Sequence, residues 1–385
     1  MTSRGRLRLR AVLALACGAM VVLAAGCGTQ AGPASTPALR VQTAPLSTSL
    51  VTPQGTWAVA VMGGSAADEN NFWQLFVRPA GASRWSLVTP QGVADNGGLV
   101  AAGGTSLVVG FRPSQGLAFS PLATSGDTGR NWTPGLLDAD LADVPDAMAV
   151  APAGQTLALL HDGGIEAAAS AAAATAGQWS RLTTQSALAA SAPGRGCGLV
   201  AVNAVSFGPN NVPMTAGSCV RRGVAGVFAD RGGAWQAAGP VLPAGFGGDQ
   251  VQVLGLASTA GTAGGNAALL VAGTSLLAAW SDGGRWTVSA PVAGGTVRAS
   301  GFGPGGSVWV LLGGGRAETI GGPGASWRTL PSVPEGTATL APGPGSGAYD
   351  ALAVAGSRLT VWRLAAGAWA RVQVITVPIT YGSSS

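Results

Sequence analysis

The sequence predicts an all-β fold, a seven-bladed β-propeller of four-stranded antiparallel blades. Tryptophans recur behind short turns at intervals of 41 to 56 residues, about the length of one four-stranded blade. Apolar runs of about five to eight residues alternate with clusters of Gly, Pro, Asn and Asp, as buried strands alternate with turns. The 62 Gly and 24 Pro favour a chain made mostly of turns and short strands. The repeated tryptophans are Trp85, Trp132, Trp179, Trp235, Trp286, Trp327 and Trp369.

Residues 1–26 have the pattern of a secretory signal peptide. Four arginines within the first ten residues precede a run, residues 11–26, of apolar or small side chains. That run has 16 residues, fewer than the roughly 20 that span a bilayer as a helix. Because no Arg-Arg pair precedes it, we expect the general secretory route rather than the twin-arginine route.

The signal ends in Leu23-Ala24-Ala25-Gly26-Cys27, which resembles the lipobox of bacterial lipoproteins. The resemblance implies that Cys27 is lipidated and becomes the mature N-terminus, at the extracytoplasmic face of the cell membrane. The alternative is an ordinary cleaved signal with a free cysteine. Residues 28–45 are small, polar and Pro-containing, so the segment 27–45 is expected to be a flexible tether behind the lipid.

The charge of the mature chain is nearly balanced. Four of the 21 basic residues lie in the signal, which leaves 17 against 16 acidic residues, a net charge of about +1. No basic surface is expected, and therefore no nucleic-acid partner. Beyond residue 26, no apolar run is long enough to span a membrane.

The propeller is expected over residues 46–381, with a four-strand pattern clearest in residues 295–334. The blades are predicted at about 46–92, 93–140, 141–190, 191–243, 244–294, 295–334 and 335–381. In the sixth blade the strands are Thr296–Phe302, Ser307–Leu312, Arg316–Ile320 and Trp327–Leu330. Each repeated Trp is expected to fill the gap between neighbouring sheets. Either residues 38–44 or residues 372–381 supply the last outer strand.

One turn matches the pattern S-x-D-x-G-x-x-W in full. Its defining residues are Ser125, Asp127, Gly129 and Trp132. It resembles the Asp-box, or BNR repeat, of propellers that include sialidases and photosystem assembly factors. The Asp side chain is expected to cap backbone N–H groups of its own turn, and the Gly to take a positive φ. The resemblance implies a structural role at the outer edge of a blade, away from any active site.

Cys197 and Cys219 are predicted to form a disulfide, as an exported chain favours. They lie symmetrically about residue 208, inside a Gly-Pro-Asn-Asn turn, so they would face each other across a hairpin. Cys197 would begin the innermost strand of the fourth blade, and Cys219 would end the next strand. Two separate buried thiols are the alternative. With a single His and no close Cys pair, no metal site is expected.

Propellers bind ligands mostly on the face formed by loops between the second and third strands and by loops between blades, which is an analogy at the level of the fold. Mapping these loops yields carboxylates in the first three blades and arginines mainly in the fourth, sixth and seventh. The candidate ligand residues are Arg112, Asp138, Asp140, Asp143, His161, Asp162, Arg221, Arg222, Arg316 and Arg358. The stretch 138–146 holds four Asp, which either bind a cation such as calcium or form a solvated loop. His161-Asp162-Gly163-Gly164 is expected to be a turn rather than a catalytic pair.

The predicted function depends partly on catalytic residues of sialidases that this sequence lacks. Sialidases use an Arg triad, a Tyr nucleophile with a Glu partner, and an Asp acid/base. Here no Glu lies close in sequence to Tyr349 or Tyr381, and Phe111-Arg112-Pro113 matches the family's arginine motif only in part. We therefore expect a monomeric, non-catalytic binding or scaffold module for a protein or glycan, without a cofactor. The alternatives are a carbohydrate-active hydrolase of the Asp-box class and an assembly factor for a membrane complex.

Overall fold

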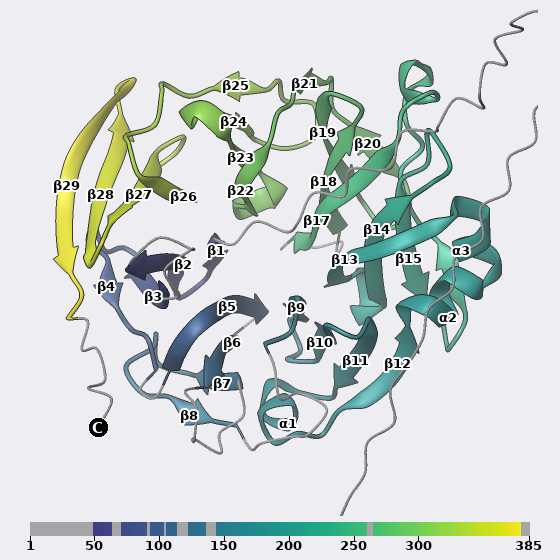
Figure 1. The fold of residues 1–385 in the computed structure, drawn as a ribbon, viewed down its shortest axis with the longest axis horizontal. Coiled ribbons are helices and arrows are strands. Elements are labelled where there is room, and N and C mark those ends of the chain that lie inside the picture. The colour runs from purple at the N-terminus through teal and green to yellow at the C-terminus, as the bar shows by residue number, and fades with distance from the viewer. Residues whose placement is uncertain are drawn as a thin grey trace, which may run out of the picture. The chain divides into compact units, whose positions relative to one another are not determined.

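The computed structural model describes residues 49–63, 71–90, 93–103, 105–113, 122–135, 144–259 and 265–378. The strands of these residues are antiparallel, and in chain order they fall into seven sets of four, plus one short extra strand, β21 (Figure 1). Five sets are separate sheets, and the fourth and fifth are joined by one bridge between Ser218 and Gln252. The predicted all-β propeller class is confirmed.

The strands have the following bounds. The first set is β1 (Ser49–Thr52), β2 (Gly55–Gly63), β3 (Asn71–Pro79) and β4 (Ser86–Leu87). The second is β5 (Val93–Gly103), β6 (Ser106–Pro113), β7 (Leu122–Ser125) and β8 (Thr133–Pro134). The third is β9 (Ala147–Val150), β10 (Thr156–Leu159), β11 (Gly164–Ala168) and β12 (Ser180–Thr184). The fourth is β13 (Leu199–Phe207), β14 (Pro213–Cys219), β15 (Gly226–Asp230) and β16 (Trp235–Ala237). The fifth is β17 (Val251–Thr259), β18 (Gly265–Ala272), β19 (Ser275–Ser281) and β20 (Trp286–Val288), with β21 (Val292–Ala293) beside β19. The sixth is β22 (Val297–Phe302), β23 (Val308–Leu312), β24 (Ala317–Ile320) and β25 (Arg328–Thr329). The seventh is β26 (Thr337–Pro342), β27 (Tyr349–Ala355), β28 (Arg358–Ala365) and β29 (Ala368–Thr376).

Three short α-helices interrupt the strand pattern of the described residues, and the apolar periodicity does not predict them. They are α1 (Ala171–Thr175), α2 (Gln185–Ala190) and α3 (Ala192–Cys197). Each begins behind a hydroxyl side chain, Ser170, Thr184 or Ser191, whose oxygen accepts a hydrogen bond from a first-turn N–H. Such caps satisfy donors that a helix start leaves unpaired, which stabilises even helices of five or six residues.

The sheets are arranged as a closed ring, in which the first strand of each set contacts the first strand of the next, and β26 returns to β1 and β2 (Figure 1). Apolar side chains of neighbouring sheets share a core. Trp57 and Val59 of β2, for example, pack with Val100 and Val109 of the second set. Because both faces of a middle strand are covered, such strands are apolar without alternation, and all five residues of β23 are buried.

The repeated tryptophans also connect neighbouring sheets by hydrogen bonds. In four cases the indole N–H donates to a backbone carbonyl just after the outer strand of the preceding set. The bonds run from Trp132 to Val88 (2.9 Å), from Trp286 to Ala238 (2.7 Å), from Trp327 to Ala290 (3.0 Å) and from Trp369 to Pro331 (3.1 Å). Trp179 donates instead to Ala174 in α1 (3.0 Å). In these four sets the repeated Trp therefore ties the set to the one before it.

The first and seventh sets close the ring without exchanging a strand. β29, from the C-terminal side, completes the seventh set by pairing with β28. Of the two predicted sources of this strand, residues 38–44 lie outside the described residues. Backbone N–H and C=O of Trp85 bond reciprocally with the Gln373 amide, both at 2.8 Å, and Ser49 Oγ donates to Leu340 O at 2.7 Å.

A buried ion cluster lies at the same junction. Asp350, which has no exposed surface, accepts hydrogen bonds from Arg363 Nε (2.7 Å) and from the Trp85 indole (2.9 Å). Arg78 Nε lies 3.4 Å from Asp350 Oδ2, close enough for an ion pair but without a hydrogen bond. Desolvation lowers the pKa of Arg78 from its ordinary value, and the Asp350 charge opposes that shift. We call Arg78, Trp85, Asp350 and Arg363 the seam cluster.

The predicted disulfide between Cys197 and Cys219 is confirmed, with the Cα atoms 5.4 Å apart. Its predicted setting is wrong, because Cys197 ends α3 rather than beginning the inner strand. Gly198 adopts a left-handed conformation (φ 67°) that ends the helix, so β13 starts at Leu199 and this residue pairs with Cys219. Two register shifts in β13 break the symmetry on which the prediction relied.

Candidate functional site

Two kinds of loop meet at one end of the sheets: turns between second and third strands, and connections between successive sets. Backbone hydrogen bonds join the two kinds. They run from Gln185 N to Gly163 O (2.7 Å), from Arg221 N to Cys197 O (3.1 Å), from Gly313 N to Thr296 O (2.9 Å) and from Val354 N to Gly336 O (2.9 Å). We call this surface the loop face. These bonds fix the described loops of this face to one another, so a partner that contacts them has little of this chain to order on binding.

The turn between β10 and β11 is built by its own side chain and by glycine. Leu160 N donates to Gly164 O (2.8 Å), and Gly163 N donates to Leu160 O (2.9 Å). Asp162 Oδ1 accepts from Gly164 N (2.8 Å), while Gly163 takes φ +82°. Asp162 therefore caps its turn, as Asp does in many such turns, and its second oxygen lies 3.8 Å from Arg181 Nη2.

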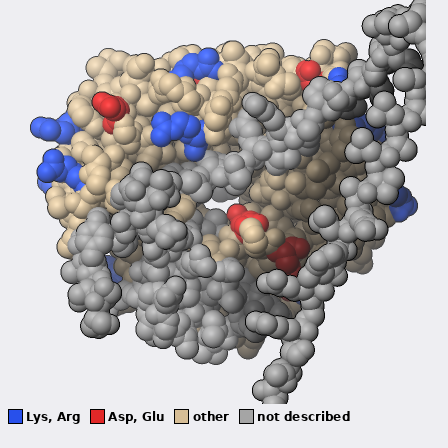
Figure 2. Space-filling view, viewed as in Figure 1, with Lys and Arg blue, Asp and Glu red and all other residues tan. Residues whose placement is uncertain are grey.

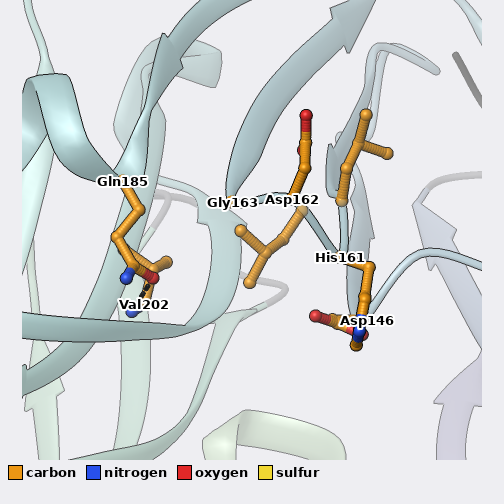
Figure 3. A pocket seen from close by; sticks show the side chains of 8 residues that line it. Asp146, His161, Asp162, Gly163, Gln185 and Val202 are labelled. Carbon is orange, nitrogen blue, oxygen red and sulfur yellow. Dashed lines mark hydrogen bonds and ion pairs between the residues drawn. The ribbon is translucent and has the colours of Figure 1, made fainter. Parts of the chain in front are cut away.

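This turn borders a shallow hollow between the third and fourth sets, of about 120 Å³ (Figure 3). Its lining residues are Asp146, Leu159, Leu160, His161, Asp162, Gly163, Gln185 and Val202. His161 Nδ1 lies 3.3 Å from Asp146 Oδ1, and the two side chains are 87% and 50% exposed. Figure 3 shows the Asp162 carboxylate pointing away from this pair.

Gln185 at the start of α2 forms the opposite wall of the hollow. Its Oε1 accepts from Val202 N (3.0 Å), and its Nε2 donates to Val200 O (3.2 Å). The amide thus pairs with the irregular edge of β13, where the register shifts leave backbone groups in need of partners. Gln185 was not among the predicted site residues, because no local sequence pattern around it indicates a contact with β13.

A second missed group lies beneath the same turn. Arg181 Nε donates to the buried Glu166 (2.7 Å), and its Nη2 lies 3.8 Å from Asp162. Arg181 and Glu166 stand opposite each other on β12 and β11. Cross-strand opposite charges are a recognisable pairing, but the register shift beside them hides it from the sequence.

The candidate arginines lie on different sheets and mostly bond to backbone carbonyls. Arg221 Nη1 donates to Gly196 O (3.2 Å), and Arg222 Nη1 donates to Gly248 O (2.8 Å). Arg316 Nη2 donates to the carbonyls of Ala293 and Gly294, while its Nε lies 3.5 Å from Glu318. Arg358 begins β28 and is exposed. These side chains do not converge on one point; they fasten loops and leave part of each guanidinium at the surface.

Several predicted residues have no side-chain description. Asp138, Asp140 and Asp143 lie outside the described residues, and so does Cys27. Arg112 lies in β6, but the position of its side chain is not described. Within the described part of the chain, no group of three or more His, Cys, Asp or Glu side chains has an arrangement suited to a metal ion.

Exposed arginines are spread around the ring. On the face in Figure 2, arginine atoms lie over the sheets that contain β23 to β29 and also at the opposite side, while acidic atoms lie near the ring centre by β9 and β10 and at the rim. Among the described residues every set has at least one exposed arginine: Arg84, Arg130, Arg181, Arg221, Arg285, Arg328 and Arg358 are examples in chain order.

The turn over Ser125–Trp132 has the hydrogen bonds that its pattern predicts. Asp127 Oδ1 accepts from Asn131 N, and Ser125 Oγ accepts from Gly129 N, both at 2.9 Å. The bond from Asn131 lowers the pKa of Asp127 from its ordinary value. Gly129 has φ +80°, and a Cβ there would lie 2.8 Å from Val88 Cβ. Trp132 donates to the carbonyl of the same Val88, so this turn is a contact between sheets.

The chemistry available at the hollow is polar recognition with proton exchange. Asp146 accepts, a nitrogen of the His161 ring donates or accepts according to its tautomer, and the Asp162 carboxylate, 63% exposed, bonds to Gly164 N and lies 3.8 Å from Arg181. Paired carboxylates are also the groups that glycoside hydrolysis requires.

In the described residues, no helix is long and apolar enough to cross a membrane.

Comparison with known proteins adds structural likeness only. No protein-family model matches the chain, and no curated protein matches it. Among solved structures, YCF48 from Cyanidioschyzon merolae is 15% identical, with a TM-score of 0.47 over 80% of this chain and 92% of that one. Virginiamycin B lyase from Staphylococcus aureus is 11% identical, with a TM-score of 0.45 over 84% and 92%. The fucose-specific lectin of Aleuria aurantia is 12% identical, with a TM-score of 0.41 over 79% and 99%.

Proposed function

We propose that this chain is an exported, lipid-anchored propeller whose loop face binds a protein or glycan without chemically changing it. The observation that carries the proposal is the arrangement of the loop-face side chains. Asp162, Gln185, Arg221, Arg222 and Arg316 are each bonded to backbone of their own or a neighbouring loop. These polar and charged groups are fixed by their bonds and held apart from one another, which favours recognition of an extended partner over bond cleavage at one point.

The proposed location rests on the sequence alone. The basic start, the apolar segment and the lipobox-like ending at Cys27 support export and anchoring. A tether of about 18 residues would let the ring lie several nanometres from the bilayer. In that setting the partner is another protein, such as a membrane complex under assembly, or a cell-surface glycan.

The test compares partner capture by the unaltered protein with capture by the double variant Arg221→Glu/Arg222→Glu. Crosslinking in membranes and a glycan array are the two readouts. We expect weaker capture with an unchanged thermal transition, because both side chains are exposed. Arg231→Glu/Arg285→Glu, two exposed arginines in turns between third and fourth strands, is the matched control. Equal capture by both double variants contradicts a role for this part of the loop face.

One observation favours the hydrolase alternative: Asp146 and Asp162 border the same hollow, with His161 beside Asp146. Against it stands the one tyrosine among the described residues, since Tyr381 lies outside them. Tyr349 is buried, and desolvation raises its pKa, which disfavours the phenolate. Hydrolysis of sialosides or common glycosides that disappears in Asp162→Asn, Asp140→Asn or Asp143→Asn would establish the enzyme instead.

A further inference from the structure

The outer strand of the seventh set differs from the other outer strands. β29 has nine residues, whereas β4, β8, β16, β20 and β25 have two or three and β12 has five. Figure 1 shows β29 at the rim of the ring. β28 pairs with one edge of it along its whole length, and among the described residues no strand pairs with the other edge.

Proteins usually protect such an edge by making it short, charged or Pro-containing. β29 contains no Pro, one charge and one register shift. Val372 and Val374 are 42% and 45% exposed, and they are two of the five exposed large apolar residues among the described residues. A long, β-branched, unpaired edge of this kind is a template for one more strand.

The charge around this edge indicates which strand it would accept. Arg358 and Arg371 are exposed on the seventh sheet, and Arg328 is exposed on the outer strand of the sixth. The one acid within β26 to β29 is Asp350, which is buried and bonded to Arg363. The exposed charge along this edge is therefore basic. A second copy of the strand would bring its own Arg371 near the Arg371 of the first copy, and the two positive charges would repel each other.

We propose that the β29 edge binds an extended acidic segment of a partner protein, which adds to the seventh sheet as a fifth strand. Main-chain hydrogen bonds to β29 would supply affinity, and contacts with Val372, Val374 and Arg371 would supply selectivity. This surface is separate from the loop face and does not depend on the function proposed for it.

The test uses a fluorescent nine-residue peptide of alternating Val and Glu, and the protein purified after expression of the full chain. We expect saturable binding, seen as a rise in anisotropy, that weakens as the salt concentration rises. A control peptide of alternating Val and Lys, the Val/Lys peptide, should not bind. Arg371→Glu should weaken it roughly threefold to tenfold, the size expected for reversing an exposed charge, while Arg285→Glu leaves it unchanged.

The backbone contribution is tested separately. Of two peptides N-methylated on alternate residues of opposite parity, one should lose binding and the other keep it, because only one edge of the added strand faces β29. Equal losses contradict strand addition. Three other results would each overturn the proposal in favour of another occupant. The first is equal binding of the Val/Lys peptide, and the second is a concentration-dependent dimer, seen in sedimentation, that excludes the acidic peptide. The third is binding that appears only after deletion of residues 28–44.

Discussion

The seam cluster makes a specific prediction about stability. Asp350→Asn keeps the size of the side chain but removes its charge, which leaves Arg78 buried without an ionic partner. Breaking a buried ion pair by removing one partner costs about 3–5 kcal/mol. Because the Arg363 side chain is 15% exposed and can turn towards water, we expect the lower end, about 3 kcal/mol. Unfolding roughly 300 ordered residues releases about 0.6 kcal/mol per kelvin of entropy, so Tm should fall by about 5 °C.

Thermal and urea unfolding measure this change, and hydrogen exchange locates it. Protection should be lost first in β29 and β4, on either side of the junction. Asp282→Asn, an exposed carboxylate in the turn before β20, is the matched control and should have an effect below about 0.5 kcal/mol. In Asp350→Asn/Arg363→Gln the effects should be non-additive by more than about 0.5 kcal/mol, since the two groups are in direct contact. An Asp350→Asn protein as stable as the Asp282→Asn control would show that the charge of Asp350 does not stabilise the closed ring.

Three further predictions concern other parts of the chain. Replacing Cys197 and Cys219 together by Ser should lower the free energy of unfolding by about 3 kcal/mol, measured in urea, because the bridge closes a segment of 22 residues; an unchanged midpoint contradicts this. In an NMR titration the Asp127 carboxyl should have a midpoint below its value in an unfolded peptide, and Asn131→Ala should raise that midpoint. Because the pKa of Asp127 is lower in the folded state, its contribution to stability is present above the unfolded-state pKa and is lost as pH falls through the folded-state pKa. Mass spectrometry of the mature protein should find diacylglyceryl-Cys27, and Cys27→Ala should release the protein from membranes; an unmodified N-terminus at another residue is the contrary result.

The strands of the sixth set were predictable within one or two residues, because its Gly-rich turns interrupt an otherwise continuous apolar pattern. The predicted Ser307–Leu312 became β23 (Val308–Leu312), and Arg316–Ile320 became β24 (Ala317–Ile320). The third and fourth sets were less predictable. There α2 and α3 replace an expected connection and the start of an expected strand, because side-chain caps and Gly198 decide the local conformation. Periodicity carries no information about such caps once the apolar pattern is interrupted.

The candidate site was predictable only by position along the chain. Turn residues such as His161 and Asp162 were correctly placed in a turn, because Gly and Asp determine turn geometry locally. Their partners were not predictable, since Asp146 and Gln185 come from connections that reach the hollow only when the third and fourth sets take their places beside each other.

The sequence by itself determined the class of the fold, which follows from spacing and from short-range patterns of apolar, Gly and Trp residues. It also determined the cysteine pairing, because Cys197 and Cys219 are the only cysteines beyond residue 27. Only the tertiary structure decided how the ring closes and what each charge does. Asp350 and Arg78 are 272 residues apart in the sequence, yet they form one buried cluster, and Arg221, Arg222 and Arg316 bond to carbonyls of other loops. The physical reason is that a charge acts on whatever lies within a few ångströms of it, and in a closed ring those neighbours come from both ends of the chain.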